Sequence, residues 1–598
     1  MKYQIECSDP ASHEFGVSLT FVAQGDECLE LPSWIPGSYM VRNFAQHLHD
    51  LKAVDEKGHA VTLKKLDKQR WALNAQGEIT VTYRVYAFDL SVRTAFLDST
   101  RGYFNGPAVF LRVVSKQDEP HALTISRIKA AHWNVSTTLP EQKVDDRGFG
   151  DYLAANYEEL IDNPVEIGEQ QSGTFEVNGV PHEMAFTDAD EIDLDRICTD
   201  VQIACAEHVA MFGELPTDRY LFMTLAMADG FGGLEHKHCT SLITKRSDLP
   251  TKALAAQSDG YRNFIALCSH EYFHLWNVKR IKPEVLQQSD LLSEAHTQLL
   301  WAFEGITSYY DELGIVRCGA VERNDYLTML ASAMTRLMRT RGRERQSVAE
   351  SSFDAWTKFY LQDANAPNVI VSYYNKGGLV SFGLDMWIRD VTQEQKTLDD
   401  VMRYLWQHYG REEKGVPEDA FESVIENVAG TSPHEFFEQY IYGTAELPLD
   451  DWFAKVGVGL IRRTTGKTSD TGRCLPTPKD KTKSVIRLGA RWSQADHGVP
   501  LTYVEKDSMA YRAGLSANDL LIAMNGEKLS CDNILGLLER HGVGAEVEVI
   551  YFRRDLLHTT KIRIEEGSAN AIDVYWIADD QLDDAVKARR EAWLATSQ

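Results

Sequence analysis

The stretch Ser269-His270-Glu271-Tyr272-Phe273-His274-Leu275-Trp276 decides the fold of this chain, because it combines a metal-ligand spacing with a helical apolar pattern. Residues four apart lie on one face of a helix, so His270 and His274 can direct both imidazoles at one metal ion. Glu271 lies about 100° further round the helix and points beside that ion. This position suits a general base acting on a water that the metal activates. The stretch therefore predicts a catalytic metal site.

A catalytic zinc ion usually takes three protein ligands, so one more is needed. The candidate is Glu304, which stands in the apolar run 300–310. A buried carboxylate is costly unless a positive group meets it, and a metal ion would do so. Two alternatives remain open: Glu304 pairs with Lys279 or Arg280, or His296 on the same predicted helix is the ligand.

The apolar periodicity divides the 598 residues into five predicted parts. The chain is too long for one hydrophobic core, which stops growing at roughly 250 to 300 residues. We therefore expect a multidomain α+β protein. Its predicted parts are an N-terminal antiparallel β domain (1–172), a catalytic domain (173–320), a helical subdomain completing the cleft (321–460), a linker with a small module (461–575) and an exposed helical tail (576–598).

Within the catalytic part, the period of the apolar residues alternates between that of strands and that of helices. Strands are predicted near 220–227 and 240–244, and helices over 193–212, 257–279 and 293–316. Further along, the basic run of Arg336, Arg339, Arg341, Arg343 and Arg345 is interpreted as a solvated, salt-bridged helix end rather than a phosphate site.

The charge argues against several classes of partner. There are 62 basic and 88 acidic side chains, a net charge of −26, which repels nucleic acid and anionic membrane surfaces. Nine scattered cysteines form no Cys-x-x-Cys pair, and we expect reduced thiols. The N-terminus lacks the apolar run of a signal peptide, and no stretch reaches the ~18 apolar residues of a membrane span. These features predict a cytoplasmic protein, with no signal for its oligomeric state.

In its predicted metal site and in several other segments, the chain resembles the glycyl aminopeptidase family of zinc metallopeptidases. Members of this family are relatives of aminopeptidase N with a thermolysin-like, gluzincin catalytic domain. The matching segments are WIPGSY at 34–39, HEYFHLWNVKRIKP at 270–283, FEGIT at 303–307 and a C-terminal PDZ-like module. The resemblance covers almost the whole chain. It implies one catalytic Zn²⁺ ion held by His270, His274 and Glu304, although two imidazoles and one carboxylate suit several divalent ions.

The wider clan adds a candidate residue for binding the substrate. Its G-x-M-E-N strand binds the free amine of a peptide through the glutamate, and this chain has Gly232-Gly233-Leu234-Glu235-His236 at the matching place. Leu replaces Met and His replaces Asn, which weakens the match. The resemblance implies that Glu235 binds the substrate amine. The alternative is an ordinary Gly-Gly turn with a solvated Glu235.

A second clan motif, Y-x-K-G, matches Tyr374-Asn375-Lys376-Gly377. The resemblance implies that Tyr374 donates a hydrogen bond to the oxyanion that develops during peptide hydrolysis. Adjacent Tyr373 is the rival, and either tyrosine can serve packing alone. The expected substrates are peptides with a free N-terminus, with a preference for glycine or alanine as the first residue.

The C-terminal module resembles a PDZ domain in three segments, 486–490, 508–515 and 518–526. The backbone of Leu488-Gly489-Ala490 can cradle a peptide C-terminus, or the module only packs on the catalytic domain. Two other functions stay open. One is a zinc endopeptidase or carboxyl-side exopeptidase with the same metal site and no amine anchor. The other is a PDZ-type peptide-binding scaffold with a vestigial zinc site.

Overall fold

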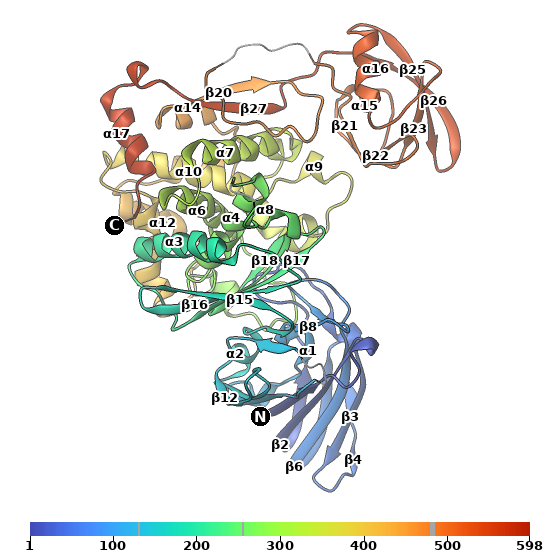
Figure 1. Cartoon of the computed structure of the whole chain (residues 1–598), viewed down its shortest axis with the longest axis vertical. Coiled ribbons are helices and arrows are strands. Elements are labelled where there is room, and N and C mark those ends of the chain that lie inside the picture. The colour runs from blue at the N-terminus through green and yellow to red at the C-terminus, as the bar shows by residue number, and fades with distance from the viewer. Residues whose placement is uncertain (129–131, 254–255, 479–484, 598) are drawn as a thin grey trace.

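The computed structural model describes residues 1–128, 132–253, 256–478 and 485–597 (Figure 1). Three regions follow one another along the long axis. The N-terminal sheets lie at one end, a helix-rich block lies in the middle, and a small sheet module projects from the other end. No helix in the described ranges is both long and apolar enough to span a membrane.

The N-terminal region is built on two long strands, β2 (Glu14–Glu30) and β6 (Arg70–Tyr86), which pair antiparallel along their full length. Alternate side chains of β2, such as Phe15 and Leu19, are buried in a core that belongs to this region. One neighbouring pair, β1 (Lys2–Glu6) with β10 (His121–Ile125), is parallel. The predicted antiparallel pattern is wrong at that pair, whose strands lie far apart in the sequence.

Two sheets make up this region. The larger has the order β12-β13-β10-β1-β2-β6-β3-β4, with β5 beside β6 and β9 beside β2, and the smaller has the order β11-β14-β8-β7. The remaining bounds are β3 (Leu48–Asp55), β4 (Ala60–Val61), β5 (Lys64–Lys65), β7 (Ala95–Leu97), β8 (Arg101–Phe104), β9 (Arg112–Val113), β11 (Asn134–Ser136), β12 (Glu141–Val144), β13 (Gly150–Ala154) and β14 (Val165–Gly168).

The central block begins with a sheet ordered β15-β16-β17-β19-β18. Strands β16, β17 and β19 run parallel, while β15 and β18 are antiparallel edge strands. The structure confirms the two predicted strands as β17 and β19. The bounds are β15 (Gln171–Val177), β16 (Val180–Thr187), β17 (Tyr220–Met227), β18 (Gly232–Glu235) and β19 (Cys239–Lys245).

The helices of this block differ from the prediction at their ends. Helix α3 (Leu194–Phe212) is confirmed, but α4 (Asp259–Phe273) ends before His274 and does not continue to residue 279. The side-chain amide of Asn277 donates to the carbonyl oxygens of Ala302 and Phe303, which holds the chain in a turn. The helix predicted from residue 293 begins only near residue 300. It opens with a π-helical turn (Trp301–Gly305) and continues as α6 (Ile306–Arg317).

Residues 321–457 are mostly helical, as predicted for 321–460, and include α7 (Arg323–Met338), α9 (Ala366–Val369), α10 (Asn375–Val391), α11 (Leu398–Leu405) and α12 (Ala420–Ala429). Buried side chains of α7, α10, α11 and α12 join those of α3, α4 and α6 in one hydrophobic cluster. The predicted boundary at residue 320 thus falls inside a continuous core. Helix α17 (Asp584–Trp593) was expected to be exposed, but Trp593 is fully buried in the same cluster.

The C-terminal module has a core of its own. Its sheet has the order β21-β22-β23-β25-β26, with β24 beside β23, and two short helices accompany it. The chain then returns to the central block, where β27 (Ala571–Trp576) pairs with β20 (Val458–Arg463). The bounds are β21 (Ala490–Trp492), β22 (Val499–Val504), α15 (Met509–Arg512), β23 (Leu520–Met524), β24 (Glu527–Lys528), α16 (Ile534–His541), β25 (Glu546–Arg553) and β26 (Leu556–Arg563).

Candidate active site

Helix α4 brings two of the predicted ligands and the predicted base to one place. Its first turn is capped by Ser258, whose hydroxyl accepts a hydrogen bond from the Tyr261 amide. Apolar side chains along α4, among them Phe264 and Phe273, are buried in the large core. This packing fixes the axis of α4, so the side chains of its last turn are held in position beside the cavity that they line.

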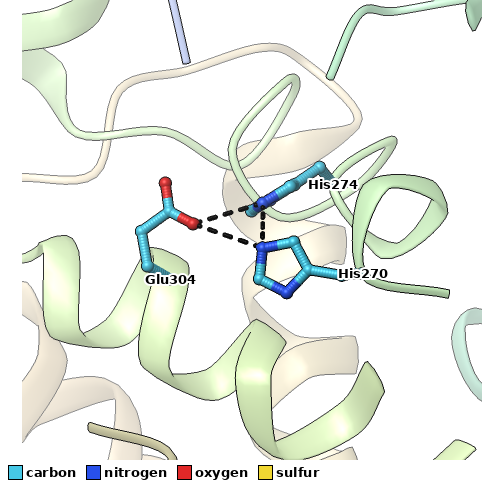
Figure 2. A group of neighbouring side chains, drawn as sticks. All are labelled: His270, His274 and Glu304. Carbon is cyan, nitrogen blue, oxygen red and sulfur yellow. Dashed lines mark hydrogen bonds and ion pairs between the residues drawn. The ribbon is translucent and has the colours of Figure 1, made fainter. Parts of the chain in front are cut away.

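Figure 2 shows His270, His274 and Glu304 directed at a common point. The two Nε2 atoms lie 3.0 Å apart. Oε2 of Glu304 lies 3.6 Å from Nε2 of His270 and 3.2 Å from Nε2 of His274. Tetrahedral donors at the usual zinc bond lengths of about 2.0–2.1 Å lie about 3.3 Å apart. The three atoms therefore have the spacing of ligands around one ion.

The outer nitrogens of both imidazoles are held by acceptors. Nδ1 of His270 lies 2.7 Å from Oδ2 of Asp311, and Nδ1 of His274 lies 2.6 Å from the carbonyl oxygen of Asn277. These partners place the proton of a neutral imidazole on Nδ1, so each Nε2 presents a lone pair to the other. Facing lone pairs repel unless a cation lies between them. The residues fit a divalent metal ion, and the donor set suits zinc.

Glu304 is buried in the π-helical turn, and its Oε1 accepts a hydrogen bond of 3.1 Å from the Tyr39 hydroxyl. Burial raises the pKa of this carboxyl, but His274 and then His270 outweigh burial and hold the pKa at about 2. Its other oxygen, Oε2, has no hydrogen-bond partner among the described residues. That oxygen is the one directed at the two imidazoles.

The alternatives for Glu304 do not match the structure. Nζ of Lys279 pairs with Asp162 at 2.7 Å, and the Arg280 guanidinium donates to the carbonyl oxygens of Leu275 and Pro216. Neither cation pairs with Glu304. The rival ligand His296 lies outside the cluster, because its Nδ1 is 2.9 Å from the carbonyl oxygen of Phe353 and its ring stacks on that side chain.

Glu271 lies beside the cluster and is buried. Its Oε2 has no hydrogen-bond partner in the described part of the chain. A Cβ atom on Gly233 would lie 2.0 Å from Oε1 of Glu271, so the close approach of β18 to this carboxylate requires glycine. Burial, and then the negative charge of Glu235, raises the pKa of Glu271 to about 7. A carboxylate with a pKa near neutrality is suited to accept and return a proton.

Glu235 stands at the end of β18, the edge strand nearest α4, where it pairs in register with Thr240. It is 3% exposed, so the alternative of a Gly-Gly turn with a solvated glutamate is wrong. Its Oε1 has no hydrogen-bond partner among the described residues. One oxygen of Glu235 lies within 4.8 Å of ligand atoms of Glu271 and His274. A buried carboxylate with a free oxygen here attracts a cationic group of a ligand.

The two candidate tyrosines lie in different surroundings. Tyr374 lines the cavity, its ring lies 6.3 Å from that of His270, and its hydroxyl lies 3.1 Å from the hydroxyl of Tyr360. Tyr373 is fully buried, and its hydroxyl has no hydrogen-bond partner among the described residues. The structure thus places Tyr374 where a ligand can reach it and Tyr373 in the core.

These groups line one cavity of about 550 Å³, which we call the catalytic cleft. Its lining is rich in carboxylates, namely Glu235, Glu271, Glu304, Asp311 and Glu312, while its basic residues are Arg93 and Arg336. An acidic lining favours positive groups, whether a metal ion or an ammonium. The cleft can therefore hold a metal ion and a cationic ligand side by side.

Four supporting residues were not predicted from the sequence: Asp311, Asn277, Tyr39 and Tyr360. A signal existed for Asp311, which lies seven residues after Glu304 and so on the same face of a helix. The acceptor at Asn277 is a backbone carbonyl, which no residue type reveals. Tyr39 lies within the matched WIPGSY segment, but its contact with Glu304 joins residues far apart in the sequence.

Known proteins share this sequence and structure. The family model of the Peptidase M61 N-terminal domain matches residues 2–169, and that of the M61 glycyl aminopeptidase matches residues 263–380. The crystal structure of an aminopeptidase N family protein from Idiomarina loihiensis has 33% identity and a TM-score of 0.94, over 99% of this chain and 100% of that one. An M1 zinc metallopeptidase from Deinococcus radiodurans has 13% identity and a TM-score of 0.47, over 75% of this chain and 95% of that one. No curated protein matches the chain.

Proposed function

Because the chain belongs to the M61 glycyl aminopeptidase family and is a peptidase, we propose that it is a zinc-dependent aminopeptidase that removes small N-terminal residues from peptides. One observation carries this proposal. A single cleft joins a cluster of two imidazoles and a carboxylate spaced for one ion, a carboxylate with a pKa near 7, and a second buried carboxylate with a free oxygen.

In this proposal His270, His274 and Glu304 hold the zinc ion. When bound, zinc supplies a Lewis acid that polarises the substrate carbonyl and makes water more acidic. Glu271 accepts the proton of the attacking water and returns it to the leaving amine, a task that its pKa of about 7 suits. Tyr374 donates a hydrogen bond to the carbonyl oxygen as negative charge develops there.

Glu235 makes the peptidase an aminopeptidase in this proposal. Its carboxylate pairs with the ammonium of the first residue, which positions the first peptide bond at Glu271 and excludes peptides that extend further in that direction. Two observations support a small first residue: the glycyl aminopeptidase model matches the catalytic segment, and a Cβ atom on Gly37 would lie 2.4 Å from Oε1 of Glu235. The second shows how little space surrounds the carboxylate.

Several finer assignments are also proposals. We infer that the C-terminal module is PDZ-like, supported by its sheet with the edge strand β21 and the two helices α15 and α16. The central block is interpreted as a thermolysin-like zincin domain. The domain boundaries at 172, 460 and 575, and a cytoplasmic location, remain predictions from the sequence.

The test is to compare hydrolysis of glycyl p-nitroanilide by the zinc-loaded protein with hydrolysis of the same compound acetylated on its amine. Loss of a buried ion-pair partner costs about 3–5 kcal/mol, so we expect the acetylated compound to react at least about 100-fold more slowly. Equal rates would contradict an amine anchor and indicate an endopeptidase. No turnover of either compound would contradict the enzyme and favour a peptide-binding scaffold.

A further inference from the structure

A second cavity of about 550 Å³ lies between the central block and the C-terminal module, and we call it the interdomain cavity. One wall comes from the end of α7 and from residues near 371–375, and another from residues 487–492 of the module. Residues 465–471, which connect the two regions, complete the lining. The metal ligands do not contribute to it.

The interdomain cavity collects positive charge in a chain whose net charge is −26. Its ionisable lining consists of five cations, Arg336, Arg339, Lys467, Arg487 and Arg491, and one carboxylate, Glu505. The carboxylate pairs with Arg487 at 2.9 Å. Within the described ranges, no carboxylate forms an ion pair with any of the other four cations. The cavity is therefore strongly electropositive.

The cations differ in how they are used. Arg339 donates to the carbonyl oxygens of Thr468 and Asn570, at 2.8 Å each, so it is a structural brace and not the solvated helix end that we predicted. Burial, and then the charges of Arg487 and Arg491 among its neighbours, lowers the pKa of Arg339. Lys467 and Arg491 are exposed on the cavity wall, with Arg491 lying over the ring of Tyr503 at 5.2 Å. Lys467 and Arg491 are thus available to a ligand.

The cavity is held in shape from both sides. Oδ1 of Asn368 in α9 accepts hydrogen bonds of 3.0 Å from the Tyr503 hydroxyl and from the Lys506 amide, while its Nδ2 donates to Val504. These contacts fix the module on the central block, and the Arg339 bonds fix the connecting segment. Gly489 has φ +73°, and a Cβ atom there would lie 2.1 Å from Cβ of Ser508, so the backbone of this wall is closely fitted.

The interdomain cavity adjoins the catalytic cleft. Arg336 and Asn375 line both of them, and Nε of Arg336 lies 3.3 Å from Oδ1 of Asn375. Strand β21, whose residues line the cavity, ends the sheet of the module and leaves one edge open to an extended segment. We therefore infer that a peptide with its ammonium at Glu235 passes Arg336 before its distal part reaches the basic wall.

We propose that the interdomain cavity binds a carboxylate of the peptide substrate, in the part of the peptide that follows the cleaved bond. The enzyme would then prefer peptides whose C-terminal part carries a negative charge. This proposal rests on the proposed aminopeptidase function. The chemistry required is that of a carboxylate, which either the C-terminus or an acidic side chain supplies. Salt screens the attraction between partly solvated cations and a carboxylate. The preference for negatively charged peptides should therefore weaken as ionic strength rises.

The experiment uses peptides of glycine followed by alanines, from three to about ten residues long, since an extended chain gains about 3.3–3.6 Å per residue. Each length is made in three forms: with a free C-terminus, with an amidated C-terminus, and amidated with a final glutamate. Release of glycine by the full-length zinc-loaded protein gives kcat/KM for each form. Glycyl p-nitroanilide, which ends within the cleft, measures the proposed function separately.

Beyond a threshold length, we expect the free-acid form to react about five- to thirtyfold faster than the amide, because one or two ion pairs of about 1 kcal/mol separate them. In the double variant Lys467→Gln/Arg491→Gln this ratio falls toward one. The matched control is Lys528→Gln/Arg554→Gln, which removes two exposed cations of the same module outside the cavity lining and leaves the ratio unchanged. Preference for the glutamate form alone would assign the site to acidic side chains.

Binding provides a second measurement that does not depend on turnover. In the Glu271→Gln background, calorimetry should give a lower Kd for the long free-acid peptide than for its amide, and the double variant should remove the difference. Equal kcat/KM and equal Kd for acid and amide at every length, with glycyl p-nitroanilide still hydrolysed, would overturn the cavity proposal alone. Failure to hydrolyse any free-amine substrate would overturn the proposed function and this inference with it.

Discussion

The catalytic cleft and the interdomain cavity share Arg336 and Asn375 in their linings, yet their charges are opposite. The cleft is lined by five carboxylates and two cations, and the cavity by five cations and one carboxylate. A peptide carries an ammonium at one end and a carboxylate at the other, so this pair of sites favours one orientation. The net charge of the whole chain, −26, therefore does not predict which ligands either site binds, because the charged residues that line each site decide this.

The largest effect should come from breaking the chemistry of the cleft while its metal cluster stays intact. We expect Glu271→Gln to lower the turnover of glycyl p-nitroanilide by about 10²- to 10⁴-fold, since an amide cannot accept the proton. Bound zinc, measured by atomic absorption, should be unchanged. The matched variant His274→Ala should lose both zinc and turnover, because it removes a ligand. Retained turnover in Glu271→Gln would contradict the mechanism.

The next largest effect should come from the catalytic cleft at Glu235, which is proposed to bind the substrate ammonium. Glu235→Gln should lower kcat/KM for glycyl p-nitroanilide by about 10²- to 10³-fold, as expected for breaking a buried charge pair. The slow reaction of the acetylated compound should change far less, because it has no ammonium and responds only to the change in the pKa of Glu271. Glu312→Gln is the control: burial, and then Asp311, raises the pKa of Glu312 to about 8, so its carboxyl is mostly neutral at pH 7. A large loss in the control instead would move the amine site to Glu312.

A smaller effect separates the two neighbouring tyrosines. Tyr374→Phe should lower kcat by about 10²-fold, the lower end of the cost of losing an oxyanion donor, and should leave KM nearly unchanged. Tyr373→Phe should have little effect on kcat, because Tyr373 is fully buried and does not line the cleft. Kinetics of both variants with glycyl p-nitroanilide make the comparison. The opposite pattern would assign the donor to Tyr373.

Much of the candidate site could be predicted because its chemistry is local in sequence. The spacing of His270 and His274 on one helix face predicts a pair of metal ligands without any knowledge of the fold. Glu304 was found because a carboxylate in an apolar run needs a positive partner. The supporting contacts were not predictable in this way. Tyr39 and Glu304 meet across 265 residues, and such pairs depend on how the β region docks on the helices.

The prediction of the fold failed where a tertiary contact overrides a local pattern. The helical period continues past Phe273, yet the chain turns, because Asn277 bonds to backbone oxygens of the segment that carries Glu304. The tail 576–598 is highly charged, and its composition conceals the buried pair Trp593 and Leu594 that anchors it. Arg339 was interpreted as solvated because a run of arginines gives no sign of the carbonyl oxygens that it braces.

The smallest effect tests a cation that lies in neither site. Lys376 follows the shared wall residue Asn375 and is 1% exposed, and its Nζ has no hydrogen-bond partner among the described residues. Burial lowers its pKa from 10.5 to about 8, with Glu446 and Arg343 as weaker influences of opposite sign. Between pH 8 and 10.5 the unfolded chain binds more protons at this residue than the folded protein, so its contribution to stability rises with pH over that range.

Below pH 8 the buried ammonium carries its full cost of about 3 kcal/mol, from about 1.4 kcal/mol per pKa unit. Lys376→Met should therefore stabilise helix α10 at pH 7, seen as slower amide hydrogen exchange, and should lose most of this advantage near pH 10.5. Lys358→Met, which removes an exposed lysine paired with Asp354, is the control and should change little. Destabilisation at pH 7 would mean that the ammonium has a partner in solution.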